Sequence, residues 1–408
     1  MLTDRGRSVL ALGGFSYLAA WAFGSPVLYP VALGLVLAVV AGALWVRFLR
    51  RPVTFHRLVP GGERVAGDDV PVEVVVRVEG STPPTGFVVS EKIARLGGRE
   101  TPLRRAREGE LRGSYVLPRV PRGRYPIESA EVVIEDPFAL ERVEIQLPAG
   151  ESLLVYPRLV DLDVLFSESG SRAPDGRRLL LRRSSGFELH SVREYEQGES
   201  LRRVHWPSTA RRAQLMVKEL EDAPRDEVAV LLDADASVVA GDPPDTSFEL
   251  EVQVAGSLLQ AHARRGRRAS LVVSSRRPVY QPVHSFDGEW KLALEQLAAV
   301  EPDGAMPVST MLANETGPAA RALELAVVTA VLTPRLADRL LQRTLARHGV
   351  SLVYVDPVSF QDPGASLPAD ASAQLVRLRR AGIPIAVVRR GDDLRRALSG
   401  DVVEAAVG

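Results

Sequence analysis

Three oxygen-bearing side chains recur at alternate positions in the stretch Asp233-Ala234-Asp235-Ala236-Ser237. The residues before it, Glu227–Leu232, contain the continuous apolar run that is typical of a buried strand in a parallel sheet. Ligands of such sheets bind beyond the carboxyl ends of the strands. Because Mg²⁺ prefers carboxylate and other oxygen ligands, Asp233, Asp235 and Ser237 are candidate metal ligands.

The same residues resemble the DxSxS beginning of the metal-ion-dependent adhesion site in von Willebrand factor A domains, with Asp235 in place of the middle Ser. That site also takes a Thr and an Asp from later loops, and the later strand Val327–Thr333 contains no Asp. The favoured interpretation is therefore a turn in which an Asp caps the next helix. We expect an Arg or helix amides, rather than a cation, to relieve the repulsion between the two carboxylates.

Composition and motifs exclude several other chemistries. The chain has no cysteine, which rules out disulfides, thiolate metal sites and a cysteine nucleophile. It contains no GxGxxG, P-loop or GxSxG motif, and its 6 histidines are scattered without the spacing of a metal pair. Its 51 Lys and Arg balance 51 Asp and Glu, so no global basic field points to nucleic acid. No cofactor is expected, and Mg²⁺ at the incomplete site is the alternative.

Acidic and basic residues interleave in residues 188–222, which we call the charged segment. Arg side chains suit bidentate pairing with the nearby Glu residues, and Trp206 offers a large apolar anchor. Two interpretations follow: an internally paired clasp pinned by a buried Trp206, or a docking surface. The interleaved Glu residues argue against nucleic acid. The candidate residues are Arg193, Glu194, Tyr195, Gly198, Glu199, Arg202, Arg203, Trp206 and Arg211.

Two folded regions flank this segment. Residues 52–157 carry short β-type runs separated by Gly and Pro turns, which predicts an antiparallel β-sandwich. Residues 226–408 alternate strand and helix patterns, which predicts an α/β domain with a doubly wound, Rossmann-like parallel sheet. Residues 158–225 form an Arg-rich linker followed by the charged segment. The arginines at 172–183 indicate either a solvated loop or a patch for anionic lipid or an acidic partner.

The N-terminal region, residues 1–51, predicts a transmembrane helical hairpin. Ser8–Phe23 and Val27–Val46 carry no charge, and a short Gly-Ser-Pro turn joins them. Arginines flank both runs on the outside and none lies in the turn, so the positive-inside rule places both termini and the soluble domains in the cytoplasm. The competing interpretations are a signal peptide cleaved near Ala20-Trp21-Ala22 and a buried helical hairpin.

The charged segment resembles the motif R-E-Y-x-x-G-D-x-x-R-x-I-x-W-x-x-x-A-R of the bacterial domain of unknown function 58 family. The matching positions are Arg193, Glu194, Tyr195, Gly198, Arg202, Trp206, Ala210 and Arg211, whereas Glu199 stands for the usual Asp and Pro207 for a frequent Lys. Arg122–Tyr125 and Asp136–Leu140 look like the RGxY and DPFGL turns of that family.

The resemblance implies a bacterial integral membrane protein with a von Willebrand factor A-like domain and no agreed enzymatic activity. Members are often encoded beside a MoxR-type AAA+ ATPase and sometimes a transglutaminase-like membrane protein. The expected function is therefore a membrane-anchored adaptor that acts with the ATPase in assembly or maturation of other proteins. The alternative is a metal-dependent hydrolase or adhesion module that uses Asp233, Asp235 and Ser237.

Overall fold

A computed structural model describes most of the chain. The residues it describes are 1–49, 53–59, 62–78, 86–107, 109–148, 150–169, 188–194, 204–212, 214–221, 228–304, 306–314, 317–361 and 367–399. The chain divides into two compact units, Met1–Arg158 and Leu159–Gly408.

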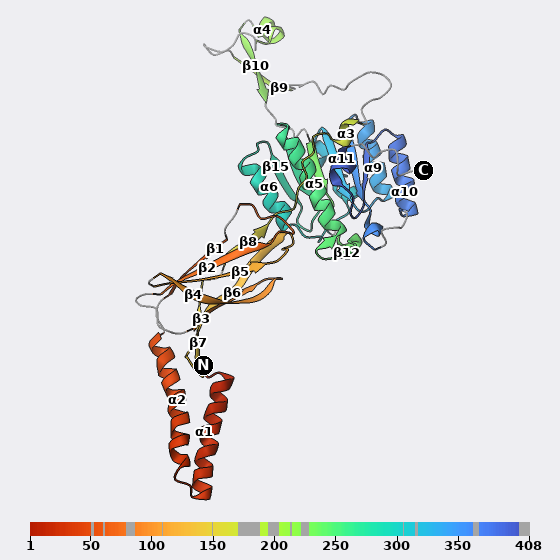
Figure 1. The fold of residues 1–408 in the computed structure, drawn as a ribbon. Coiled ribbons are helices and arrows are strands. Elements are labelled where there is room, and N and C mark those ends of the chain that lie inside the picture. Colours follow the sequence, from red (N-terminus) through yellow and green to blue (C-terminus); the bar gives the residue numbers. More distant parts are fainter. Residues whose placement is uncertain are drawn as a thin grey trace. The chain divides into compact units, whose positions relative to one another are not determined.

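Two antiparallel helices, α1 (Asp4–Phe23) and α2 (Leu28–Leu49), open the first unit (Figure 1). Thr3 caps α1, since its side chain accepts from the backbone N–H of Gly6. The helix pair expected from the sequence is therefore present. Among the described residues, one helix, Leu28–Phe48, is long and apolar enough to cross a membrane, with a mean hydropathy of 2.2. A signal sequence near the N-terminus would satisfy the same criterion.

The helix α1 differs from α2 in composition. It carries Asp4, Arg5 and Arg7 in its first turns, and its apolar stretch is diluted by Gly, Ser and Tyr. Both predicted helices are therefore present. Of the two, α2 is the one that is long and apolar enough to span a membrane.

An antiparallel sheet follows, as predicted. Its strands are β1 (Val53–Leu58), β2 (Val70–Val78), β3 (Gly86–Ile93), β4 (Gly97–Arg107), β5 (Glu110–Leu117), β6 (Gly123–Glu135), β7 (Arg142–Gln146) and β8 (Ser152–Val155). They form one hydrogen-bonded path, β1-β2-β5-β4-β3-β6-β7, with β8 on β6. The expected division into two separate sheets is not seen, because the long strand β4 pairs with β3 in its first half and with β5 in its second. The sheet thereby curls around a core that includes Val74, Val89 and Val132.

The second unit contains a six-stranded sheet in the order β15-β14-β11-β16-β17-β18. Its strands are β11 (Val228–Leu232), β14 (Ala269–Val273), β15 (Val279–Val283), β16 (Glu324–Thr329), β17 (Gly349–Val355) and β18 (Ile385–Val388). All neighbouring strands are parallel except β14 and β15. The predicted fully parallel sheet is therefore mixed, because β15, whose sequence VYQPV lacks an apolar run, adds an antiparallel edge where Pro282 is tolerated.

Helices alternate with these strands, as the sequence pattern predicts (Figure 1). The longer ones are α5 (Ser247–Arg264), α6 (Gly288–Ala299), α9 (Pro334–Leu345), α10 (Ala369–Arg380) and α11 (Leu394–Ser399). The short ones are α3 (Phe166–Ser169), α7 (Val308–Met311), α8 (Pro318–Arg321) and the 3₁₀ turns η2 (Ala236–Val238) and η3 (Pro357–Phe360). A minor two-stranded pair consists of β12 (Gly241–Asp242) and β13 (Asp245–Thr246). The chain moves from β11 to one side of the sheet and then from β16 to the other, so β11 and β16 border the topological switch point.

The charged segment forms a small unit of its own. The strands β9 (Glu188–Glu194) and β10 (Met216–Glu221) pair antiparallel as a two-stranded sheet, and the short helix α4 (Trp206–Arg212) lies between them in the sequence. We call this unit the β9–β10 hairpin. In the described residues its strands pair with each other and with no strand of the six-stranded sheet.

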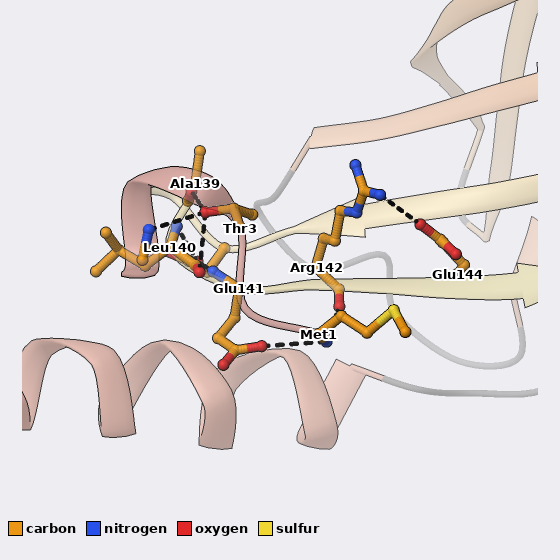
Figure 2. Close-up of polar contacts among 9 residues, drawn as sticks. Met1, Thr3, Ala139, Leu140, Glu141, Arg142 and Glu144 are labelled. Carbon is orange, nitrogen blue, oxygen red and sulfur yellow. Dashed lines mark hydrogen bonds and ion pairs between the residues drawn. The ribbon is translucent and has the colours of Figure 1, made fainter. Parts of the chain in front are cut away.

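The turn Asp136–Leu140 between β6 and β7, which we call the DPFAL turn, contacts the N-terminal residues that lead into α1 (Figure 2). The hydroxyl of Thr3 donates to the Ala139 carbonyl at 2.6 Å, and the backbone N–H of Thr3 donates to the Leu140 carbonyl at 3.0 Å. Leu2 extends this contact as a β-bridge to Glu141, and the Met1 amino group pairs with the Glu141 carboxylate at 3.2 Å.

Two glycines make this approach possible. A Cβ added at Gly6 of α1 would lie 2.1 Å from the Leu140 carbonyl oxygen, which no side chain tolerates. A Cβ added at Gly42 of α2 would lie 3.3 Å from the Asp136 carboxylate. Both helices therefore touch the DPFAL turn through positions that lack a side chain.

Gly6→Ala should weaken this contact. We expect the variant to lose about 1–3 kcal/mol of unfolding free energy, because the new methyl group must push α1 away from the turn. The measurement is thermal unfolding of the full chain in detergent. The matched control is Gly14→Ala, because an added Cβ there meets nothing within 4 Å and Ala is the better helix former. Equal melting temperatures for the two variants would contradict the close contact.

Candidate functional site

The carboxyl edge of the second sheet brings together polar side chains from neighbouring strands. Asp233 follows β11 directly and is 5% exposed. Its carboxylate accepts from the hydroxyl of Ser274, after β14, at 3.0 Å and from the hydroxyl of Thr329, at the end of β16, at 2.8 Å. The backbone N–H of Asp233 continues the ladder to Val328. The aspartate is thus held by hydroxyl groups from both flanking strands.

Asp235 and Ser237 face each other. The Asp235 carboxylate accepts from the backbone N–H of Ser237 at 2.8 Å and from its hydroxyl at 2.7 Å, and so caps η2. This is the arrangement of the turn interpretation, although the next α-helix, α5, has its own cap in Thr246. Among the residues that the structure describes, no three His, Cys, Asp or Glu side chains lie close enough to hold a metal ion.

A second buried carboxyl group, Glu251 on α5, completes the cluster. It is 3% exposed, and the backbone N–H of Ala330 donates to it. Burial raises the pKa of Glu251 well above its usual range, and repulsion from Asp233 and Asp235 adds to the rise. The sequence interpretation missed this residue. The available signal was its place on the buried face of α5, between Phe248 and Val252.

The pKa of Asp233 shifts in the same direction as that of Glu251. Burial raises the pKa of Asp233 as well, while the hydrogen bonds from Thr329 and Ser274 pull it down. No Arg pairs with Asp233 among its hydrogen bonds and ion pairs in the described chain. Of the two expected sources of relief, the amide is the one observed, because the backbone N–H of Ser237 donates to the Asp235 carboxylate. Around Asp233 itself, the hydroxyls of Ser274 and Thr329 are the donors.

The arginines lie at the other end of the same edge. Arg389, after β18, places its Nε 3.4 Å from the fully buried carboxylate of Asp356, which follows β17. Arg390 pairs with Asp245 at 2.7 Å, and its backbone N–H donates to the hydroxyl of Ser359. These contacts close the β17–β18 side of the edge with opposite charges.

The structure places the candidates of the charged segment only in part. Arg193 and Glu194 lie in β9, where they pair with Val217 and Met216 of β10. Arg211 is exposed in the last turn of α4. Tyr195, Gly198, Glu199, Arg202 and Arg203 lie outside the described residues, as do the arginines at 172–183.

The expectation of a buried Trp206 is wrong. Its side chain is 65% exposed at the first position of α4. The apolar interior of this small unit is filled instead by Val204 and Met216, which are 4% and 1% exposed. His205 fixes α4 on β10, because its backbone N–H donates to the Met216 carbonyl at 2.8 Å. Val204 and Met216 occupy the interior, and the indole of Trp206 lies on the surface. The interpretation of a clasp held by a buried Trp206 is therefore not supported.

The Asp233–Glu251 cluster makes stability depend on pH. Since the folded pKa of Glu251 exceeds the ordinary value of 4.5, the folded state binds the proton more tightly than the unfolded state. The stabilisation is full below pH 4.5 and is lost as pH rises toward the folded pKa, by up to about 1.4 kcal/mol per unit. Glu251→Gln, which is neutral at every pH, should flatten this decline in denaturant titrations of the full chain.

His262 supplies a control of opposite sign. It is 1% exposed on α5, and burial, followed by Arg267 and Arg265, lowers its pKa to about 3. Its stabilisation is full above pH 6.5 and is lost as pH falls from 6.5 toward 3. His262→Asn keeps an acceptor for Arg267 and should flatten only the loss of stability that accompanies the fall in pH from 6.5 toward 3. If the fall in stability as pH rises above 4.5 were the same in Glu251→Gln as in the unaltered chain, the assignment of Glu251 would be wrong.

We expect no tight divalent cation binding at this edge. The oxygens of Asp233 already accept from two hydroxyls, and Asp235 is engaged with Ser237. Calorimetric titration of the full chain with Mg²⁺ and with Mn²⁺ measures this directly, with Asp233→Asn as the comparison. Micromolar binding that disappears in the variant would contradict the prediction.

Comparisons with known proteins identify the family. The family model described as "Protein of unknown function DUF58" matches residues 191–399. The "Uncharacterized protein YeaD" of Bacillus subtilis (strain 168) is 26% identical over 279 residues, which cover 68% of this chain and 66%, just under two thirds, of that protein.

Two solved structures share weaker likenesses. Proximal thread matrix protein 1 from the mussel byssus is 12% identical with a TM-score of 0.29, covering 43% of this chain and 46% of that one. Cwp6 from Clostridium difficile is 11% identical with a TM-score of 0.21, covering 82% and 45%. At such TM-scores neither likeness bears on the fold. The family match covers just over half of the chain and includes both the charged segment and the six-stranded sheet, and the chain therefore belongs to the DUF58 family.

Proposed function

We propose that this protein is a membrane-anchored, non-enzymatic adaptor that acts with a MoxR-type AAA+ ATPase in the assembly or maturation of other proteins. The observation that carries the proposal is the exposed Trp206 on the β9–β10 hairpin. A large indole held in water on a small, separately paired unit suits a role in binding another protein.

The surroundings of Trp206 support a docking surface. Leu215, just before β10, is 41% exposed, and Arg211 and Arg212 are exposed in the last turn of α4. Trp and Arg are the residue types that dominate binding energy in protein interfaces. The two guanidinium groups fit a partner surface that offers carboxylates beside an apolar pocket.

The architecture of the second unit fits the same proposal. Numbered along the chain, the six strands lie in the order 3-2-1-4-5-6, which is a doubly wound arrangement. This order supports a von Willebrand factor A-like domain. Its carboxyl edge is closed by internal hydrogen bonds and ion pairs, as expected of a scaffold.

Anchoring by both helices is part of the proposal. Arg5 and Arg7 flank the start of α1 and Arg47 lies near the end of α2, whereas the turn between the helices is uncharged. This distribution supports a two-helix membrane hairpin with the soluble domains in the cytoplasm. A transglutaminase-like membrane protein is a further proposed partner, and nucleic acid is not.

The alternative function is a metal-dependent hydrolase or adhesion module that uses Asp233, Asp235 and Ser237. It is less well supported, because Asp235 and Ser237 bind each other and Asp233 is 5% exposed between two hydroxyls. A nucleophilic water would need both access to a metal and a carboxylate free to act as its general base.

Trp206→Ala tests the adaptor. We expect binding to the purified MoxR-type ATPase of the same bacterium to weaken at least about 30-fold, which corresponds to the 2 kcal/mol of an interface anchor. The stability of the full chain should change by less than about 0.5 kcal/mol, because the side chain is exposed. Binding is measured by calorimetry in detergent.

The matched control is Tyr280→Ala, which removes another exposed aromatic, 46% exposed on β15, from outside the hairpin. It should leave the affinity unchanged. A Trp206→Ala variant that binds normally, or one that unfolds, would refute the role assigned to the hairpin.

A further inference from the structure

The DPFAL turn lies beside the apolar span of α2. The three atoms nearest to a Cβ added at Gly42 all belong to the carboxylate of Asp136, at 3.3 to 3.6 Å. Gly42 lies six residues before Phe48, the last residue of the span, so the contact is about 9 Å inside the end of the apolar helix. If α2 spans a bilayer, the DPFAL turn therefore also contacts that bilayer.

The tip of this turn presents an aromatic side chain. Phe138 is 74% exposed, although it belongs to a sheet whose other large apolar residues mostly line the core. Its position is fixed from behind, because the Asp136 carboxylate accepts from the backbone N–H groups of Phe138, Leu140 and Glu141 at 2.8, 2.7 and 2.5 Å. Because these hydrogen bonds already order the backbone of the turn, little further conformational entropy is lost when the Phe138 ring inserts into lipid.

The residues at the same level have the composition of a membrane interface. Trp45 and Phe48 are exposed on the last turns of α2, at 40% and 80%. Arg5 and Arg7 flank Gly6, which contacts the turn through Leu140. Aromatic rings and arginines together are enriched where acyl chains meet headgroups, and the arginines suit anionic phospholipid.

We propose that the DPFAL turn is a third membrane contact, which inserts Phe138 at the boundary between the headgroups and the acyl chains of the nearer leaflet. The partner is the phospholipid bilayer. The inference rests on the proposed anchoring through α2 and adds a lipid-binding role for the sheet domain. The two helices hold the protein in the membrane, and the turn fixes how the sheet meets the membrane surface.

The absence of cysteine in the chain gives a direct test. Single-cysteine variants carry an environment-sensitive fluorophore in full-length protein reconstituted into bilayers of phosphatidylcholine and phosphatidylglycerol. Spin labels at carbon 5 or carbon 12 of the lipid chains quench the fluorophore according to its depth. The three positions are Phe138→Cys, Leu37→Cys in the middle of α2, and Val116→Cys on β5, and all three native side chains are at least half exposed.

Val116 is the matched sheet control. It lies next to Leu117, whose strand leads into the start of β6, and β6 then runs 13 residues to the DPFAL turn, which is about 40 Å along the strand. We expect several-fold stronger quenching at 138 than at 116, greater with carbon 5 than with carbon 12. At Leu37 the deeper label should quench more.

The outcomes separate this inference from the anchoring. Quenching at 37, with position 138 no more quenched than 116, would overturn the lipid contact and leave the anchor intact. Absence of quenching at all three positions would overturn the anchoring and this inference with it. Stronger quenching by carbon 12 than by carbon 5 at 138 would contradict the proposed interfacial depth.

Discussion

One carboxylate organises the first half of this protein. Asp136 accepts three backbone N–H groups of its own turn, and the turn so formed meets α1 at Gly6 and α2 at Gly42. Without that charge, the buried N–H groups of Leu140 and Glu141 would lose their acceptor, at a cost of about 1–3 kcal/mol each. The shape of the turn, the seating of both helices and the outward direction of Phe138 all depend on this side chain.

In the second half, a buried carboxylate accepts from side-chain hydroxyls rather than from backbone N–H groups. Asp233 and Glu251 are buried close together, and burial raises the pKa of both carboxyl groups, while the hydroxyls of Ser274 and Thr329 donate to Asp233. On the β9–β10 hairpin, by contrast, an indole and two guanidinium groups are exposed, and this is the surface that we propose for a partner.

Elements with strong local patterns could be predicted from the sequence, and features set by tertiary contacts could not. The apolar run before Asp233 and the helical spacing of α5 predicted the α/β unit, and the family motif was recognised from the charged segment. The strand β15 was missed because an edge strand needs no apolar run. The size of Trp206 suggested a buried side chain, but Val204 and Met216 occupy the interior of the β9–β10 hairpin and Trp206 is exposed. Glu251 was missed because one acid on a buried helix face has no local motif.

The contact between the N-terminus and the DPFAL turn joins residues that are far apart in the order of synthesis. Leu2 and Thr3 pair with Leu140 and Glu141, so α1 and α2 leave the ribosome long before their partner in the sheet exists. The helices are therefore made before the sheet with which they pair, and the sheet later folds onto helices that are already formed. The helix pair thereby becomes the template on which the β6–β7 turn is assembled, and a delay in making the sheet leaves Gly6 and Gly42 uncovered for other chains to occupy.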